Sequence, residues 1–229
     1  MQDLQGKLVV VTGAFGHLGT AVAAHAAGRG ARLALIDRAP APAVTADAGL
    51  ALGGVDLADA GAARAAMDEV AARGGRIDAL VNVAGSFRWE TVADGSADTW
   101  DLLYRVNLRS ALCASQAVLP HLRAGGGRIV NIGANAAGRA ALGMGAYAAS
   151  KSGVARLTEA LAEELKDRGI TVNAILPGII DTPPNRRDMP DADHSRWVAP
   201  AAIADVIGFL LSDAAAAVTG ALIPVTGRL

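Results

Sequence analysis

The stretch KLVVVTGAFGHLG, residues 7–19, decides the fold of this chain. Its apolar run, residues 7–12, is typical of a strand buried on both faces, and three glycines follow with the spacing GxxGxxG. The Ala-rich segment from about residue 16 to residue 28 predicts a helix. A glycine turn between a strand and a helix lets the backbone approach a pyrophosphate closely, and the helix N-terminus offers it N–H groups. The stretch therefore predicts the start of a dinucleotide-binding fold.

The same alternation of strands and helices continues along the whole chain. The segment 39–54 holds prolines and glycines without a firm period, so it predicts a loop with at most a short helix. Strands are expected at 32–37, 77–83, 127–132, 170–176 and 221–225, and helices at 59–73, 97–122, 145–168 and 201–212. This pattern predicts a Rossmann-type doubly wound α/β fold, a parallel sheet of about seven strands with helices on both faces. We expect one domain spanning residues 1–229.

Composition limits the classes of function. The chain is 52% hydrophobic and 19% charged with a formal net charge of -1, and no stretch concentrates its basic residues. No nucleic acid partner is therefore expected. The four histidines, His17, His25, His121 and His194, lack the spacing of metal ligands, so we expect no metal site.

The cellular location is predicted from the cysteine content and from two kinds of segment, a signal peptide and a membrane span. Cys113 is the single cysteine, so no disulfide can form within the chain, as expected in a reducing compartment. Residues 1–7 lack the features of a signal peptide, and no apolar stretch reaches the roughly 18 residues of a membrane span. The sequence predicts a cytoplasmic protein without a membrane partner.

Asp37 ends the second predicted strand and bears on the choice of cofactor. A carboxylate at this place can accept hydrogen bonds from both ribose hydroxyls of adenosine and repel a 2′-phosphate, so NAD(H) is favoured. Arg38 can contact a 2′-phosphate instead, which keeps NADP(H) as an alternative. A surface aspartate in a turn is the other interpretation of Asp37.

Tyr147 and Lys151 carry the predicted chemistry. At positions i and i+4 of the predicted helix 145–168 they share one face. A nearby ammonium stabilises phenolate, so we expect a lowered tyrosine pKa and a general acid/base. Asn107, inside the predicted helix 97–122, is a third candidate, with a solvated helical asparagine as the alternative.

Together these motifs, with Asn82-Val83-Ala84-Gly85, resemble the short-chain dehydrogenase/reductase family over essentially the whole chain. The resemblance implies an NAD(P)(H)-dependent oxidoreductase in which Tyr147, Lys151 and Asn107 are catalytic. It also implies a homodimer or homotetramer. The cofactor-binding residues expected from the glycine turn and the resemblance are Gly13, Phe15, Gly16, His17, Leu18, Gly19, Asp37, Arg38, Asp56, Leu57, Asn82, Ala84, Gly85, Tyr147, Lys151, Pro177, Gly178, Ile180 and Thr182.

The chain departs from the family pattern at two positions. His17 stands where the commonest form of the glycine motif has its second glycine, and Gly16 takes that role one residue earlier. Ala134 stands where the family has its catalytic serine, and a methyl group cannot donate a hydrogen bond to a substrate oxygen. Asn135 is adjacent, but its side chain points elsewhere if the segment is extended.

One branch of the family, the dihydropteridine reductases, is similar at Ala134 and also along residues 181–193 and at Trp197. This resemblance implies an NADH-dependent enzyme acting on a small carbonyl or imine. Residues 183–198 are expected to form a substrate lid, with a solvated loop as the alternative. The expected substrate-side residues are Phe87, Trp89, Ala134, Asn135 and Trp197. Two competing hypotheses remain: a 3-oxoacyl or carbonyl reductase with a replaced serine, and a non-catalytic NAD(H)-binding regulator.

Overall fold

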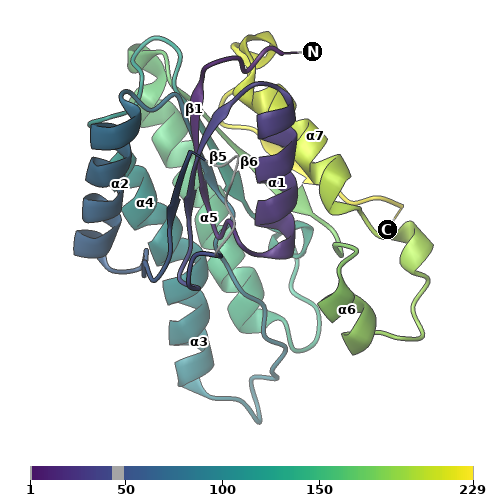
Figure 1. Ribbon diagram of the computed structural model, residues 1–229. Helices are drawn as coiled ribbons and strands as arrows, with labels where there is room; N and C mark the ends of the chain where they lie inside the picture. The colour runs from purple at the N-terminus through teal and green to yellow at the C-terminus, as the bar shows by residue number, and fades with distance from the viewer. Residues whose placement is uncertain (1, 43–48, 229) are drawn as a thin grey trace.

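Seven parallel strands form one twisted sheet in a computed structural model that describes residues 2–42 and 49–228 (Figure 1). The strand order is β3-β2-β1-β4-β5-β6-β7, and every neighbouring pair is parallel. This confirms the predicted doubly wound sheet. The strands are β1 (Leu8–Thr12), β2 (Arg32–Ile36), β3 (Leu50–Leu52), β4 (Ala79–Asn82), β5 (Arg128–Ile132), β6 (Thr171–Pro177) and β7 (Leu222–Val225).

Helices cover both faces of the sheet (Figure 1). One face carries α1 (His17–Gly28) and α7 (Pro200–Leu211), and the other carries α2 (Ala60–Gly74), α4 (Ser110–Val118) and α5 (Gly145–Leu165). The shorter helices α3 (Ala97–Leu103) and α6 (Pro183–Asp188) lie beyond the carboxyl ends of the strands. Single-turn 3-10 segments follow at η2 (Asn135–Ala137), η3 (Lys166–Arg168), η4 (His194–Arg196) and η5 (Asp213–Ala215).

The two hydrophobic cores follow from the two-residue period of the strands. In β1, Val9 and Val11 face α1 and α7, while Leu8 and Val10 face α2, α4 and α5. All four side chains are buried. A strand that buries both faces must be apolar throughout, which is the reason that the run at residues 7–12 shows no alternation.

Three elements differ from the prediction. Helix α6 lies in the segment 183–198, for which the sequence predicted a lid or a solvated loop and no helix. Strand β3 lies within a segment expected to be a loop, because three residues paired to β2 leave too short a pattern to recognise among glycines and prolines. The expected helix 97–122 is instead α3, a π-helical segment η1 (Tyr104–Arg109) and α4. A π-helical turn inside an α-helix is often found at functional sites, and η1 carries Asn107.

The direction of chain progression reverses between β1 and β4. The carboxyl ends of these strands are adjacent, with Thr12 paired to Asn82 in register. The Ala84 N–H donates to Thr12 Oγ1 at 3.3 Å, which holds the segment after β4 beside the segment after β1. A crevice at such a reversal is the usual ligand site of doubly wound sheets.

Candidate active site

The glycine turn after β1 is shaped by two close backbone contacts. Gly13 has a φ of +60°, and a Cβ there would lie 2.7 Å from the backbone of Ala84. A Cβ on Gly19 would lie 2.1 Å from the carbonyl oxygen of Gly13. Gly16 differs, because a Cβ there would meet only the Gly13 oxygen, at an ordinary 3.5 Å. The protein interior therefore requires two of the glycines, and the third borders open space.

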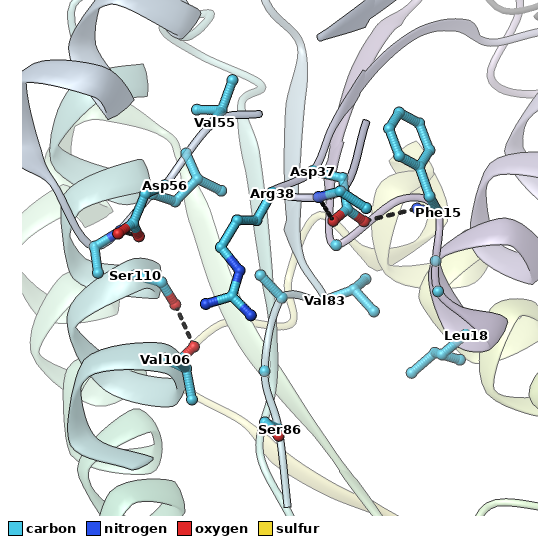
Figure 2. Close-up of a pocket in the computed structure, with 18 of the residues that line it drawn as sticks. Phe15, Leu18, Asp37, Arg38, Val55, Asp56, Val83, Ser86, Val106 and Ser110 are labelled. Atoms are coloured by element: carbon cyan, nitrogen blue, oxygen red, sulfur yellow. Dashed lines mark hydrogen bonds between the residues drawn. The ribbon is translucent and has the colours of Figure 1, made fainter. Parts of the chain in front are cut away.

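That open space is a cavity of about 480 Å³ above the N-terminus of α1 (Figure 2). No side chain caps the first turn of α1, so its N–H groups are available to a ligand. This cradle fits the pyrophosphate of a dinucleotide, which needs a close backbone approach and the positive end of a helix. The cavity is lined by Gly13, Phe15, Gly16, His17, Leu18, Gly19, Asp37, Arg38, Ala39, Val55, Asp56, Leu57, Ala58, Val83, Ala84, Gly85, Ser86, Val106 and Ser110.

Asp37 lies in the wall of this cavity with both carboxylate oxygens in use (Figure 2). Its Oδ2 accepts the Phe15 N–H at 2.9 Å, and its Oδ1 accepts the Ala39 N–H at 2.9 Å. Two backbone donors therefore hold one negative charge facing the cavity. Each oxygen keeps a lone pair for a further donor such as a ribose hydroxyl.

Asp56, in the opposite wall, is held by Arg105 of η1. Its Oδ2 accepts from Arg105 Nη2 at 2.6 Å, and its Oδ1 accepts the Ala58 N–H at 3.0 Å. The hydrogen bond from Arg105 lowers the pKa of Asp56, so this carboxylate is charged at neutral pH. Arg109, four residues after Arg105, donates from Nε to the Ala58 carbonyl at 2.8 Å.

Asn107 lies between these arginines in η1 and is buried, so it is not a solvated helical residue. Its Oδ1 accepts the Ser86 N–H at 2.7 Å, and its Nδ2 donates to the Ser86 carbonyl at 3.0 Å. Nδ2 also donates to Ser150 Oγ at 3.0 Å, and that hydroxyl donates to the Tyr147 carbonyl at 2.8 Å. Asn107 thus ties the segment after β4 to the helix that carries Tyr147.

Tyr147 and Lys151 lie one turn apart at the N-terminal end of α5. Lys151 is buried, and its Nζ donates to the Ile132 carbonyl at 2.7 Å. Burial lowers the pKa of Lys151 to about 8 and raises the pKa of Tyr147 to about 12. The expected lowering of the tyrosine pKa is therefore wrong for this structure, because burial removes water from the charged phenolate.

Gly85 joins the cavity to this pair. A Cβ on Gly85 would lie 2.8 Å from Asn107 Oδ1 and 3.3 Å from Lys151 Nζ. Since Gly85 also lines the cavity, the cavity ends beside the buried lysine. The phosphate-sized cradle thus ends at the lysine that lies one turn along α5 from Tyr147.

Ala134 is buried at the end of the segment after β5, and Asn135 is exposed. The backbone of Ala134 is extended, but Asn135 begins the 3-10 segment η2. The direction of the Asn135 side chain is therefore set by this helical turn and not by the alternation of a strand. On α5, Ser152 Oγ donates to the Ala137 carbonyl at 2.8 Å and holds η2 against the helix.

Aromatic side chains border Tyr147. The Phe87 ring meets the Tyr147 ring edge to face, with centroids 4.9 Å apart. Trp89 lies over Gly143, where a Cβ would be 2.1 Å from the indole. The Glu90 N–H donates to the Gly143 carbonyl at 2.9 Å, so the segments before α3 and before α5 are joined. Both aromatic rings remain more than half exposed.

Residues 183–198 are ordered by contacts at both ends. Thr182 Oγ1 accepts the Asn185 N–H at the start of α6, and Asn185 Nδ2 donates to the Ile180 carbonyl at 2.7 Å. At the other end, the Trp197 ring is buried and lies 4.4 Å from the His194 ring. Trp197 thus packs against its own segment, and its expected contact with substrate stays a prediction.

The cavity contains twelve of the nineteen expected cofactor-binding residues; the other seven lie outside its lining. Of these, Asn82 is buried and donates to Ser115 Oγ and Asn131 Oδ1, while Gly178 packs against Thr226. Their cofactor contacts remain predictions. The sequence did not predict seven further lining residues: Ala39, Val55, Ala58, Val83, Ser86, Val106 and Ser110. Each lies within three residues of a residue that was predicted, and this closeness in sequence is the signal that could have identified them.

Two kinds of feature are absent from the part of the chain that the structure describes. In residues 2–42 and 49–228, no helix has the length and apolar character needed to cross a membrane. Within the same ranges, no group of three or more His, Cys, Asp or Glu side chains is arranged to hold a metal ion.

Comparisons with known proteins show which family this chain is similar to. Residues 7–193 match the family model for short chain dehydrogenases. The D-threitol dehydrogenase of Mycolicibacterium smegmatis is 39% identical, over 98% of this chain and 93% of the relative. The 3-oxoacyl-[acyl-carrier-protein] reductase FabG of Pseudomonas aeruginosa is 35% identical, over 99% of this chain and 98% of the relative.

A solved structure is also similar. The short-chain dehydrogenase/reductase of Serratia marcescens superposes with a TM-score of 0.90 at 33% identity, covering 99% of this chain and 98% of that one. The family model, the relatives and the shared fold lead to one conclusion. This chain belongs to the short-chain dehydrogenase/reductase family.

Proposed function

We propose that the protein is an NADH-preferring reductase of a small carbonyl or conjugated imine, with Tyr147 as its proton donor. The observation that carries this proposal is the place of Lys151, one helical turn from Tyr147. Lys151 is buried, and a Cβ on Gly85, which lines the glycine-rich cavity, would lie 3.3 Å from its Nζ. A lysine buried beside a nucleotide-sized cavity is costly unless it has a function.

The residues have separate roles in this proposal. A bound nicotinamide supplies or accepts the hydride. Tyr147, whose pKa is about 12 in the free protein, keeps its proton at neutral pH and can donate it to the substrate. Lys151 is largely protonated at pH 7 because its pKa is about 8, and its charge stabilises the phenolate that remains. Asn107 holds Ser86 and the first turns of α5 in place.

The preference for NADH rests on Asp37. Its carboxylate is fixed by the Phe15 and Ala39 N–H groups and faces the cavity. A carboxylate fixed at this place accepts hydrogen bonds from the ribose hydroxyls and repels a phosphate. Arg38 lines the same wall and opposes this repulsion, so the preference is expected to be moderate.

The substrate class rests on Ala134. Without a serine hydroxyl, the site lacks a donor that stabilises developing negative charge on a carbonyl oxygen, an effect of about 3 kcal/mol in comparable oxyanion sites. A conjugated imine, such as a quinonoid dihydropterin, accepts hydride and proton with less need of that donor. The relatives named for a polyol dehydrogenase and a 3-oxoacyl reductase favour the second candidate, a carbonyl reductase in which another group replaces the serine.

The test measures NADH and NADPH oxidation by the purified protein with chemically generated quinonoid dihydropterin and with a panel of small ketones. Tyr147→Phe removes the proton but keeps the ring against Phe87, so the rate should fall about 10²- to 10⁴-fold with NADH binding unchanged. Tyr104→Phe changes the other, exposed tyrosine and should have the wild-type rate.

Each outcome decides between the candidates. Turnover of the pterin alone, lost in Tyr147→Phe, supports the imine reductase. Turnover of ketones instead supports the carbonyl reductase. NADH binding without turnover of any substrate would count against the proposal and favour a nucleotide-binding regulator. Turnover that survives Tyr147→Phe would instead show that Tyr147 is not the proton donor.

Three further properties belong to the same proposal. We propose that residues 183–198 act as a substrate lid over the site, since the segment is anchored at both ends and polar between them. We also propose a homodimer or homotetramer, as is usual in the family. The cytoplasmic location is likewise kept as a prediction.

A further inference from the structure

Four charged side chains lie around one end of the cavity. Asp37, Arg38 and Asp56 line it, and Arg105 reaches Asp56 from η1. Two carboxylates and two guanidinium groups are thus close together, and the way they pair decides which charge a bound nucleotide meets.

Asp56 forms an ion pair with Arg105. The 2.6 Å contact to Arg105 Nη2 uses Oδ2, and the Ala58 N–H uses Oδ1. Arg38 also attracts Asp56, and both guanidinium groups lower the pKa of this carboxyl, with Arg105 contributing more. Arg105 and Arg38 therefore compete for one carboxylate.

Arg38 is left without a partner of its own. Among the residues that the structure describes, it makes no ion pair, and its neighbour Asp37 is held by backbone N–H groups. Figure 2 shows the Arg38 side chain extending into the pocket, on the side of Asp56 and away from Phe15. Its guanidinium is therefore available to an anionic group on a ligand.

We propose that Arg105 is a specificity-determining positioning residue for the 2′-phosphate of NADP(H), because by holding Asp56 it leaves Arg38 free. Without Arg105, Asp56 pairs with Arg38, which neutralises the cation that would otherwise meet the phosphate. NADH has no phosphate at this place and is affected less. This inference rests on the proposed function only in that NAD(P)(H) binds in this cavity.

The test is the ratio of the Kd for NADPH to the Kd for NADH, measured by isothermal calorimetry on the purified protein without substrate. In Arg105→Met the ratio should rise about tenfold, which corresponds to the loss of one charge-assisted contact. Arg105→Lys keeps the positive charge but loses the planar guanidinium group that matches a carboxylate, so it should give an intermediate ratio. Arg109→Met is the matched control, because Arg109 holds a backbone carbonyl rather than a carboxylate and its loss should leave the ratio unchanged.

A double-mutant cycle identifies the mechanism. If Arg105 acts through Arg38, then Arg38→Met and the double variant Arg38→Met/Arg105→Met should have the same ratio. An unchanged ratio in Arg105→Met, or an equal effect of Arg105→Met in the Arg38→Met background, overturns the inference while the proposed function stands. Failure to bind either nucleotide overturns both.

Discussion

The Nζ of Lys151 lies 2.7 Å from the carbonyl oxygen of Ile132, the last residue of β5. This contact places the ammonium group of Lys151, a residue that is only 5% exposed, at the carboxyl end of strand β5. A backbone carbonyl compensates only part of the lost hydration, so the pKa of Lys151 falls to about 8. The lysine that serves the proposed reaction is therefore also a site of pH-dependent stability.

The first prediction concerns that pH dependence. Between the folded pKa of about 8 and the unfolded value of 10.5, the unfolded chain binds a proton at Lys151 that the folded chain does not. The free energy of unfolding of the wild type should therefore rise relative to Lys151→Met across this window, by about 3 kcal/mol in total. Urea unfolding of both proteins from pH 7 to pH 10.5 measures the difference. The exposed Lys166→Met serves as control and should show no such rise.

The second prediction separates the glycines. Gly16→Ala meets no close contact in the protein but replaces an N-cap glycine by alanine, so the free energy of unfolding should fall by about 1 kcal/mol or less. The new methyl group borders the cavity and should weaken NADH binding about tenfold or more, as measured by fluorescence titration. Gly13→Ala combines a φ of +60° with a 2.7 Å contact and should lose about 2 kcal/mol or more of stability. Equal effects of the two variants on stability would contradict this assignment.

The third prediction concerns Ala134. Ala134→Ser restores a donor at the position where the family has its serine, so ketone reduction should gain about tenfold or more in kcat/KM. Reduction of a conjugated imine should change little. Steady-state kinetics with one substrate of each class measures the two ratios. Ala136→Ser, within η2, adds the same hydroxyl nearby and should change neither. A gain for both substrates would mean that the missing serine does not explain substrate choice.

The fourth prediction concerns Asn107. Asn107→Ala removes three hydrogen bonds and leaves the Ser86 backbone groups without their partner. The free energy of unfolding should fall by about 1–3 kcal/mol, and kcat should fall because Ser86 and Tyr147 lose their common support. Ser150→Ala removes the hydrogen bond from Asn107 and the one to the Tyr147 carbonyl but keeps both bonds to the Ser86 backbone, so it should cost less in both measurements. Thermal unfolding and single-turnover kinetics of the two variants provide the comparison.

The prediction of the fold failed where the pattern was short or where the helix changed its period. Strand β3 has three residues, and its pairing with β2 stabilises an extended conformation that the local sequence does not signal. The residues of η1 are typical of a helix, so the sequence pattern does not distinguish the π-helical turn that contains Asn107 from an ordinary α-helical turn. The other strands and long helices were predicted because each buries an apolar face with a regular period.

The candidate site divides in the same way. The glycine turn, Asp37, Tyr147 and Lys151 could be selected from the sequence, because each residue type has a local chemical reason for its place. The partners of these residues could not be selected. Arg105 reaches Asp56 across 49 positions, and Asn107 reaches Ser150 across 43.

The sequence by itself determined the parallel sheet, the glycine turn after its first strand and the shared helix face of Tyr147 and Lys151, because these depend on periodicity and on residue type at neighbouring positions. Only the tertiary structure decided the raised pKa of Tyr147, the pairing of Asp56 and the burial of Asn107. These properties depend on which groups exclude water and which charges meet across the crevice. Such contacts join segments far apart in the chain, and no local pattern encodes them.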